Sequence, residues 1–377
     1  MIKSHLVYLN HAGTSWPKPP VVREAVRGLW DCSPNEWAEE FEKAHRDVAD
    51  FFHIPHTNQL LFTPACTTAL SIAVFDHFWN PGDRVLTSGY EHHALHRPLV
   101  KLVDQGVDVE IIPSLPHEPI ILEALEEMLR DGNVKMVAIS AASNVTGELL
   151  PIEAVVELTH EHEALVLVDA AQIAGWWDLD LPKLGADLVA FAGHKGTQGP
   201  WGIGGLYFSS ELKMNSPAAV CEITYDKDTG KPTPISVGPG WCDGGSVDRP
   251  ALAGLAAGTR WLSQPVQVDR FEVARQKSQV LYDAISALPN VTIYSPSEMT
   301  ERMPTVAFNI QSKDSILVAS ALREQGIHVA GGMQCAPLAH KTLETAPEGV
   351  VRVSVGPQNT DADIAIAIDA IGKLAVQ

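Results

Sequence analysis

The stretch that decides the fold runs from residue 164 to residue 208 and reads ALVLVDAAQIAGWWDLDLPKLGADLVAFAGHKGTQGPWGIGGLYF. Three short apolar runs within it, ALVLVDAA, DLVAFAG and IGGLYF, have the length and composition of buried strands. The first run ends near Asp169, and the second is followed by Lys195 and a glycine-rich loop. Apolar strands that end in polar residues are typical of a parallel sheet with its functional groups at the strand ends.

Upstream of this stretch, short strands continue to alternate with amphipathic segments back to about residue 59. The strands that we expect there are QLLFT, RVLTSG, DVEIIPS and VKMVAISAAS. The clearest helix is expected from Pro119 to Leu129, with Leu122 and Leu125 on its apolar face and Gly132 just beyond its end. The alternation predicts an α/β fold with a mostly parallel seven-stranded sheet.

The carboxy-terminal part has a different pattern. After the loop GKPTPISVGPGWCDGG, a long helical region from about Pro250 to Leu288 leads into the strands VTIYSP, TVAFNIQ and VVRVSVG. Further helices are expected to begin near Asp314 and Thr360. Strands mixed with flanking helices indicate a smaller α+β domain. We therefore expect a large domain over residues 16–262 and a small domain made of residues 1–15 and 263–377.

Composition narrows the classes of function. The chain has 377 residues, of which 45% are hydrophobic and 19% charged, so it can bury a large core. Its formal net charge of -19 argues against nucleic acid and anionic membranes as partners. No apolar run is long enough to span a bilayer, and the first residues lack the apolar stretch of a signal peptide, so we expect a cytoplasmic protein. The cysteines form no CxxC pair and suggest neither a disulfide framework nor a zinc knot; they are Cys32, Cys66, Cys221, Cys242 and Cys335.

Three features at the predicted strand ends could carry chemistry. The strand QLLFT runs directly into PACTTALSIAV, whose small-residue helix start could bind an anion, although a simple helix cap would look the same. Asp169 would be costly to bury without a cation, unless it only caps the next turn. Lys195 lies among apolar neighbours, where desolvation lowers the pKa of an amine, although a lone lysine is more often solvated.

Together, these features are what pyridoxal phosphate requires. Its phosphate needs a helix start, its ring nitrogen needs a carboxylate, and its aldehyde needs a lysine amine for a Schiff base. An imidazole to cover the ring could come from EHHALH at residues 91–96, again just after a predicted strand. The sequence therefore predicts a pyridoxal 5'-phosphate enzyme.

At this point a family resemblance becomes specific. The markers are YLNHAGTS, FTPACTTA, YEHHA, SNVTG, VDAAQ, GHK, GPWGIGGLYF, GGMQCAPLAHKT and VRVSVGPQNT, which run through nearly the whole chain. With these motifs the chain resembles the class V aminotransferase-like enzymes of fold type I, and within them the branch of the cysteine desulfurases and selenocysteine lyases. The resemblance implies a homodimer with a shared active site and a small amino-acid substrate.

The resemblance also implies a role for each matching residue. Lys195 would be the Schiff-base lysine and catalytic base, with Asp169 on the pyridine nitrogen, Gln172 on the phenolic oxygen and His92 stacked on the ring. The phosphate would be held by Cys66, Thr67 and His194, and Gly245 and Ser246 would reach the phosphate of the neighbouring subunit. Asn144 and Arg352 would hold the α-carboxylate of the substrate, and Cys335 would receive its sulfur.

The chain departs from the family pattern at three positions. Ala192 stands where a serine is common, Ala330 where the desulfurases usually carry an arginine, and Gln334 where a histidine often precedes the cysteine. The expected reaction is cleavage of the C–S bond of L-cysteine or an analogue, which gives alanine and a persulfide on Cys335. The alternatives are β-elimination to pyruvate, ammonia and sulfide without a protein thiol, or another class V activity such as transamination or epimerisation.

Other classes of protein fit the sequence less well. A nicotinamide-dependent oxidoreductase lacks a GxGxxG after the first strand. A metalloenzyme could use His92, His93 and His96 or the HEHE at residues 160–163, although the latter is typical of a solvated helix end. A sulfur-relay or regulatory protein that retains the fold without catalysis is a further alternative.

Overall fold

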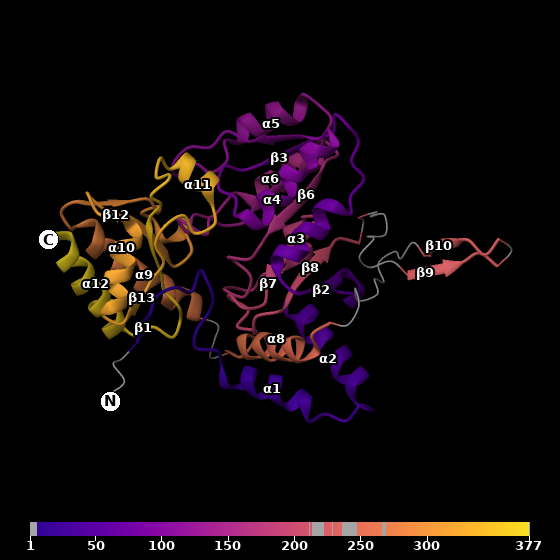
Figure 1. Ribbon diagram of the computed structural model, residues 1–377, viewed down its shortest axis with the longest axis horizontal. Helices are drawn as coiled ribbons and strands as arrows, with labels where there is room; N and C mark the ends of the chain where they lie inside the picture. Colours follow the sequence, from indigo (N-terminus) through magenta and orange to yellow (C-terminus); the bar gives the residue numbers. More distant parts are fainter. Residues whose placement is uncertain are drawn as a thin grey trace.

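The computed structural model describes residues 6–210, 212, 222–227, 229–235, 247–265 and 269–376, which form two lobes (Figure 1). The strands of the larger lobe are β2 (Leu60–Thr63), β3 (Arg84–Thr87), β4 (Asp108–Ile111), β5 (Val134–Ser140), β6 (Leu165–Asp169), β7 (Leu188–Ala192), β8 (Gly204–Phe208), β9 (Glu222–Tyr225) and β10 (Pro232–Ile235). Its α-helices are α1 (Pro20–Trp30), α2 (Trp37–Phe51), α3 (Cys66–Phe75), α4 (His93–Leu102), α5 (Leu122–Arg130), α6 (Ile152–Glu161), α7 (Leu181–Leu184) and α8 (Arg249–Leu262).

The smaller lobe is formed by the two ends of the chain. Its strands are β1 (Val7–Tyr8), β11 (Val291–Ile293), β12 (Thr305–Ile310), β13 (Ile327–His328) and β14 (Val351–Ser354). Its α-helices are α9 (Arg270–Ser286), α10 (Ser315–Glu324), α11 (Pro337–Thr342) and α12 (Asp361–Val376). Short 3-10 helices lie at Thr57–Gln59 and Val103–Gln105 in the larger lobe and at Met299–Glu301 in the smaller lobe. No helix in the described ranges is both long and apolar enough to cross a membrane.

The large sheet confirms the predicted fold class. Its described strands follow the order β2-β8-β7-β6-β5-β3-β4, and within it β8 runs antiparallel to its two neighbours while the other pairs are parallel. All seven strands predicted between residues 59 and 208 lie in this sheet. Both faces are covered: along β6, Val166 and Val168 join one apolar cluster and Leu167 joins the other. Burial on both faces explains why these strands are apolar at successive positions.

One predicted helix start is wrong. The helix expected from Pro119 begins instead at Leu122 as α5. The preceding residues are held in another conformation, because the N–H of Ile121 donates to the carbonyl of Pro113 and the Ser114 hydroxyl donates to the carbonyl of Pro119. The apolar face was identified correctly, since Leu125 and Leu129 are buried.

Two further boundaries also differ from the prediction. The long helical region expected from Pro250 to Leu288 is two helices, α8 and α9, and α8 ends at Leu262, shortly before Pro265 in the sequence. Proline cannot donate a backbone hydrogen bond and disfavours helix in the residue before it.

The predicted loop at residues 230–245 contains strand β10, which pairs antiparallel with β9. That pairing partner lies upstream of the loop, so the composition of the loop alone did not reveal it.

The smaller lobe has its own core. Strands β11, β12 and β14 form an antiparallel sheet, and β1 pairs parallel with β13. The expected helices are present: Asp314 caps α10 by accepting from two backbone amides, and α12 follows Thr360. Val7 and Leu9 lie in the same apolar cluster as Leu281 and Val353. This packing supports the division that we propose, with residues 16–262 as one domain and residues 1–15 and 263–377 as the other.

Candidate active site

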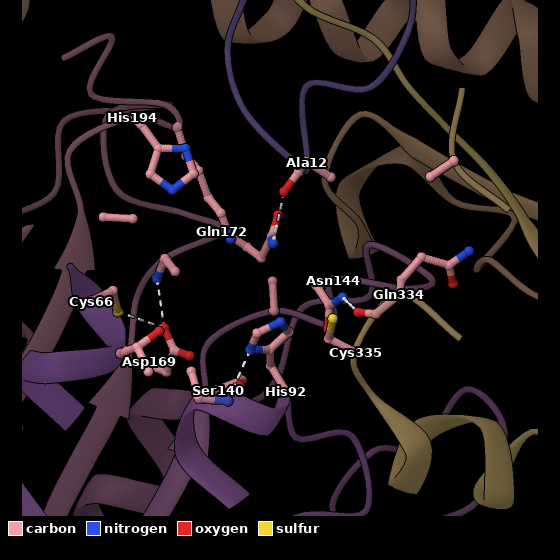
Figure 2. Close-up of a pocket in the computed structure, with 18 of the residues that line it drawn as sticks. Ala12, Cys66, His92, Ser140, Asn144, Asp169, Gln172, His194, Gln334 and Cys335 are labelled. Atoms are coloured by element: carbon pink, nitrogen blue, oxygen red, sulfur yellow. Dashed lines mark hydrogen bonds between the residues drawn. The ribbon is translucent and has the colours of Figure 1, made fainter. Parts of the chain in front are cut away.

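A cavity of about 390 Å³ opens where the parallel strands end, and both lobes contribute to its wall (Figure 2). It brings together the predicted site residues Cys66, Thr67, His92, Asn144, Asp169, Gln172, His194, Lys195, Cys335 and Arg352. These residues are far apart in the sequence, and most come from the ends of different strands of the large sheet. Two other predicted residues, Gly245 and Ser246, lie outside the described residues.

Asp169 lies at the floor of this cavity. It is the last residue of β6 and is only 5% exposed. Its Oδ1 accepts a hydrogen bond from the backbone N–H of Ala171 at 2.9 Å and from the thiol of Cys66 at 3.5 Å. Burial raises the pKa of this carboxyl, and the nearby Lys195 opposes that shift. Within the described residues Asp169 forms no salt bridge, so the carboxylate is suited to a cationic group of a ligand.

Lys195 follows β7 on a tightly packed loop. A Cβ atom on Gly175, which has a φ of +84°, would lie 2.4 Å from the backbone of Gly196, so only glycine permits this close approach. The loop therefore holds Lys195 in a fixed position beside the cavity. Burial lowers the pKa of its amine, while Asp169 acts in the opposite direction. An amine with a lowered pKa can act as a nucleophile or a base.

Helix α3 begins at the cavity, as the sequence predicts. It starts with Cys66 directly after β2, and no side chain caps its first turn. The first amides of an uncapped helix have no partner within the helix and carry a partial positive charge. Thr67 is exposed at this helix start and adds a hydroxyl group. The thiol of Cys66, in contrast, points toward Asp169 (Figure 2).

His92 projects between the two sides of the cavity (Figure 2). It is the N-cap residue of α4, and its Nδ1 accepts a hydrogen bond from the N–H of Ala94 at 3.0 Å. Burial, with the neighbouring Lys195 as a second cause, lowers the pKa of its imidazole to about 4. His92 is therefore a neutral ring near pH 7, fixed in orientation and able to stack on a planar ligand.

The other predicted cofactor residues, Gln172 and His194, lie above Asp169 and His92 in this view (Figure 2). Gln172 donates from Nε2 to the carbonyl of Ala12 at 3.2 Å. The ring of His194 contacts the hydroxyl of Thr14, with Nδ1 and Oγ1 3.1 Å apart, and burial lowers the pKa of this ring to about 4. The amino-terminal segment thus orients both side chains.

The smaller lobe brings a cation and a thiol to the cavity. Arg352, on β14, donates from one guanidinium nitrogen to the carbonyl of Asn144 at 2.6 Å and from another to Oδ1 of Asn10 at 2.8 Å. Its Nε is buried without a partner in the described structure, and burial lowers the pKa of the group to about 10. Cys335 is exposed at the cavity edge, beside Asn144 (Figure 2). A carboxylate and a sulfur atom of one small ligand could meet these two groups together.

Sequence reasoning missed Glu91 and Ser140. Glu91 is completely buried, and it accepts hydrogen bonds from the hydroxyls of Ser88 at 2.5 Å and Ser140 at 2.6 Å. Burial raises the pKa of Glu91 to about 7. Ser140 lines the cavity and pairs with Asp169 across β5 and β6. The signal was present, since Glu91 is an acid that follows a buried strand, as Asp169 is.

Sequence reasoning also missed Lys18. Its amine donates to the carbonyl of His194 and to the hydroxyl of Ser15, each at 2.6 Å, and burial lowers its pKa to about 7. The contact with His194 joins the amino-terminal segment to the residue just before Lys195. A sequence pattern could not have shown this contact, because Lys18 and His194 are 176 residues apart.

The site fits pyridoxal phosphate. The buried carboxylate of Asp169, with no salt bridge among the described residues, matches a protonated ring nitrogen, and the uncapped start of α3 matches a phosphate. Lys195 lines the same cavity with a lowered pKa, and His92 offers a neutral ring face. In the described residues no three His, Cys, Asp or Glu side chains are grouped so that they could hold a metal ion.

Comparisons with known proteins cover nearly the whole chain. The family model for Aminotransferase class-V matches residues 7–366. A probable cysteine desulfurase of Halalkalibacterium halodurans is 30% identical over 393 residues, which span 98% of this chain and 92% of the relative. A probable cysteine desulfurase of Pyrococcus abyssi is 27% identical over 391 residues, or 99% of this chain and 95% of the relative.

Solved structures show the same likeness in three dimensions. The apo structure of a cysteine desulfurase from Thermococcus onnurineus NA1 matches with a TM-score of 0.89 and 25% sequence identity, covering 98% of this chain and 95% of that chain. The match covers 98% of this chain, so both lobes share their fold with that structure.

Proposed function

This chain belongs to the class V aminotransferase family, and from that premise we propose that it is a pyridoxal 5'-phosphate-dependent cysteine desulfurase. It cleaves the C–S bond of L-cysteine or a close analogue, releases alanine and keeps the sulfur as a persulfide on Cys335. The observation that carries the proposal is that a lysine with a lowered pKa, a buried carboxylate and an exposed thiol line one cavity; they are Lys195, Asp169 and Cys335.

Each part of the cofactor has a partner in this cavity. Asp169 would hold the ring nitrogen, His92 would cover the ring, and Gln172 would bind the phenolic oxygen. The start of α3 with Thr67, together with His194, would hold the phosphate. Cys66 lies at the same helix start, but its thiol donates a hydrogen bond to Asp169. This contact favours a role in orienting the Asp169 carboxylate, and not in binding the phosphate. When bound, pyridoxal phosphate supplies an electron-accepting ring to which the substrate amine is joined.

The residues of the chain then act on the substrate. Arg352 binds its α-carboxylate with the buried Nε and the adjacent amino group, and Asn144 lies beside it. Lys195, once its amine is free, removes the α-proton as a base. The thiolate of Cys335 attacks the substrate sulfur, so that an S–S bond forms and the C–S bond breaks. The electron pair of the broken bond stays with the β-carbon, which gains a proton and becomes the methyl group of alanine.

Cationic side chains line the same cavity as Cys335, although Ala330 stands where the family usually has an arginine. Lys195 and Arg352 line the same cavity as Cys335, so two cationic side chains share its surroundings. Positive charge in the same cavity stabilises the negative charge that develops on sulfur during its transfer. The arrangement therefore supports sulfur transfer to Cys335 without an arginine at position 330.

The proposal includes a homodimer in the cytoplasm that passes its sulfur to an acceptor. Trp201, which is 66% exposed, and Trp16, which is 43% exposed, lie in segments next to the loop of Lys195 and to the cavity residue Ala12. Exposed tryptophans are enriched at interfaces, so both positions suit contact with a second subunit, whose Gly245 and Ser246 would complete the phosphate site. The described cysteines Cys32, Cys66 and Cys335 are free thiols, as expected in a reducing compartment.

Product analysis tests the proposal. The purified holoenzyme is incubated with L-cysteine and, separately, with selenocysteine, and the carbon product is identified. We expect alanine, together with a mass increase of one sulfur atom on the peptide of Cys335 after the reaction with cysteine. Cys335→Ser should lose both products from cysteine, whereas the matched variant Cys32→Ser, at a cysteine that does not line the cavity, should keep them. Pyruvate as the product, formed equally well by Cys335→Ser, would show that the enzyme eliminates sulfur without a protein thiol.

A further inference from the structure

The turn that carries Cys335 has an unusual backbone. Residues 333–336 form a turn closed by a hydrogen bond from the N–H of Ala336 to the carbonyl of Met333 at 3.0 Å. Both central residues have positive φ values, +39° for Gln334 and +60° for Cys335. Residues with a side chain adopt this conformation rarely and at an energetic cost. Contacts outside the turn must therefore hold it.

The larger lobe supplies such contacts. The side-chain amide of Asn144 donates to the carbonyl of Gln334 at 2.8 Å (Figure 2). The backbone N–H of His93 donates to the carbonyl of Cys335 at 2.8 Å. Both donors lie in the sheet lobe, whereas the turn belongs to the smaller lobe. On its own side, the turn is tied by Nε2 of Gln334, which donates to the carbonyl of Val350 at 2.7 Å. The thiol of Cys335 is thus exposed while its backbone is held from both lobes.

Asn144 is itself fixed by the residue expected to bind the substrate. Arg352 donates to the carbonyl of Asn144 at 2.6 Å, and Asn144 is buried next to the cavity. A hydrogen-bonded chain therefore runs from the guanidinium of Arg352 through Asn144 to the carbonyl of Gln334, the residue before Cys335. A role in binding the substrate carboxylate alone does not explain why Asn144 donates a hydrogen bond to this turn.

We propose that Asn144 is a positioning residue for the thiol, because it links the carboxylate-binding Arg352 to the turn that presents Cys335. The inference rests on the proposed function and deepens it. It separates two roles for Asn144 that the family resemblance does not distinguish, since a pure substrate ligand affects substrate binding only. A positioning residue also affects the turn when no substrate is present.

Hydrogen–deuterium exchange of the substrate-free holoenzyme tests this role. The variant is Asn144→Ala, and the matched control is Asn309→Ala. Asn309 makes the same kind of bond, from its side-chain amide to the carbonyl of Gly349 at 3.0 Å, but it does not line the cavity. We expect the peptide spanning residues 333–336 to exchange about fivefold faster in Asn144→Ala than in the wild type. In Asn309→Ala that peptide should exchange at the wild-type rate.

A second readout uses the thiol itself. The rate at which iodoacetamide alkylates Cys335 in the substrate-free holoenzyme should change several-fold in Asn144→Ala, with Cys32 in the same sample as the internal reference. If Asn144→Ala does not fold, Asn144→Asp replaces it, because an aspartate keeps the size of the side chain but cannot donate to the carbonyl of Gln334. Folding of each variant is checked by its thermal unfolding and its cofactor content.

The outcomes separate the two roles. If exchange and alkylation in the Asn144 variant match those of Asn309→Ala while the KM for cysteine rises, Asn144 is a substrate ligand alone and the proposal is wrong. If both readouts change and the rate of persulfide formation falls with them, the proposal stands. Neither readout requires turnover, so a wild-type protein that forms no alanine would refute the proposed function while leaving the result on the turn intact.

Discussion

The two walls of the cavity are built in different ways. Asp169 ends strand β6 and Lys195 follows the neighbouring strand β7; the two strands are joined by backbone pairing and lie between two apolar clusters. Cys335 lies on the opposite wall, in a turn with positive φ values that is held by hydrogen bonds from both lobes. Charges that must stay in place during proton transfer lie on the rigid wall, and the thiol that receives sulfur lies on a wall that depends on how the lobes meet.

The largest effect is expected from a substitution on the sheet wall, at Lys195. Lys195→Ala removes the base, and we expect the rate of alanine formation to fall by about 10²–10⁴-fold. The backbone should remain intact because its loop is held by glycine packing. The measurement is steady-state turnover of cysteine, with Lys183→Ala, a lysine outside this cavity, as the control. Turnover within about threefold of the wild type would show that another group is the base.

The next effect concerns the opposite wall. Arg352→Lys keeps the positive charge but loses the planar fork that binds a carboxylate with two hydrogen bonds. We expect the KM for cysteine to rise about tenfold, with cofactor binding unchanged. Arg260→Lys, which alters an exposed ion pair with Asp47, serves as the control. If the KM stays the same while cofactor binding weakens, Arg352 belongs to the cofactor site and not to the substrate site.

A smaller effect, on the stability of the fold, is expected at Glu91, which accepts a hydrogen bond from Ser140 on the sheet wall. Glu91 has a folded-state pKa of about 7, above its ordinary value of 4.5, because it is buried. Between these values the folded protein holds a proton that the unfolded chain releases, so this group contributes less stability as pH rises from about 4.5 to about 7. Glu91→Gln cannot titrate and resembles the protonated acid. The variant should therefore gain roughly 1–3 kcal/mol relative to the wild type across this range.

Urea unfolding at about pH 5 and about pH 8 measures this difference. Glu148 also has a pKa raised by burial to about 7, but it is present in both proteins, so the comparison isolates Glu91. A stability difference that is the same at both pH values would show that Glu91 is ionised in the folded protein throughout.

The smallest effect is expected at Asp314, which does not line the cavity but lies in the lobe that carries Cys335. Asp314 caps α10 by accepting from the amides of Ile316 and Leu317. Asp314→Ala should lower the free energy of unfolding by about 1 kcal/mol and leave the KM and kcat for cysteine unchanged. A fall in kcat would mean that the position of the thiol turn is sensitive to the whole lobe and not only to its direct hydrogen bonds.

Sequence reasoning succeeded for the sheet wall and not for the contacts across the cavity. Apolar runs located all seven strands of the sheet, and the strand-end rule singled out Asp169 and Lys195. The same rule applied to Glu91 would have identified a further buried acid at a strand end. Local patterns misjudged the start of α5 and the break between α8 and α9, because bonds to Pro113 and Pro119 and the effect of Pro265 ended the helical pattern.

The amino-acid sequence by itself determined which residues end the buried strands, since hydrophobic burial and strand period are local properties of the chain. Tertiary structure alone decided how Asn144 meets the carbonyl of Gln334, 190 residues away, and how Arg352 meets Asn144 across 208 residues. Such contacts form only after the two lobes have folded and met. Backbone carbonyls are the same in every residue, so no sequence pattern marks which of them receives a given hydrogen bond.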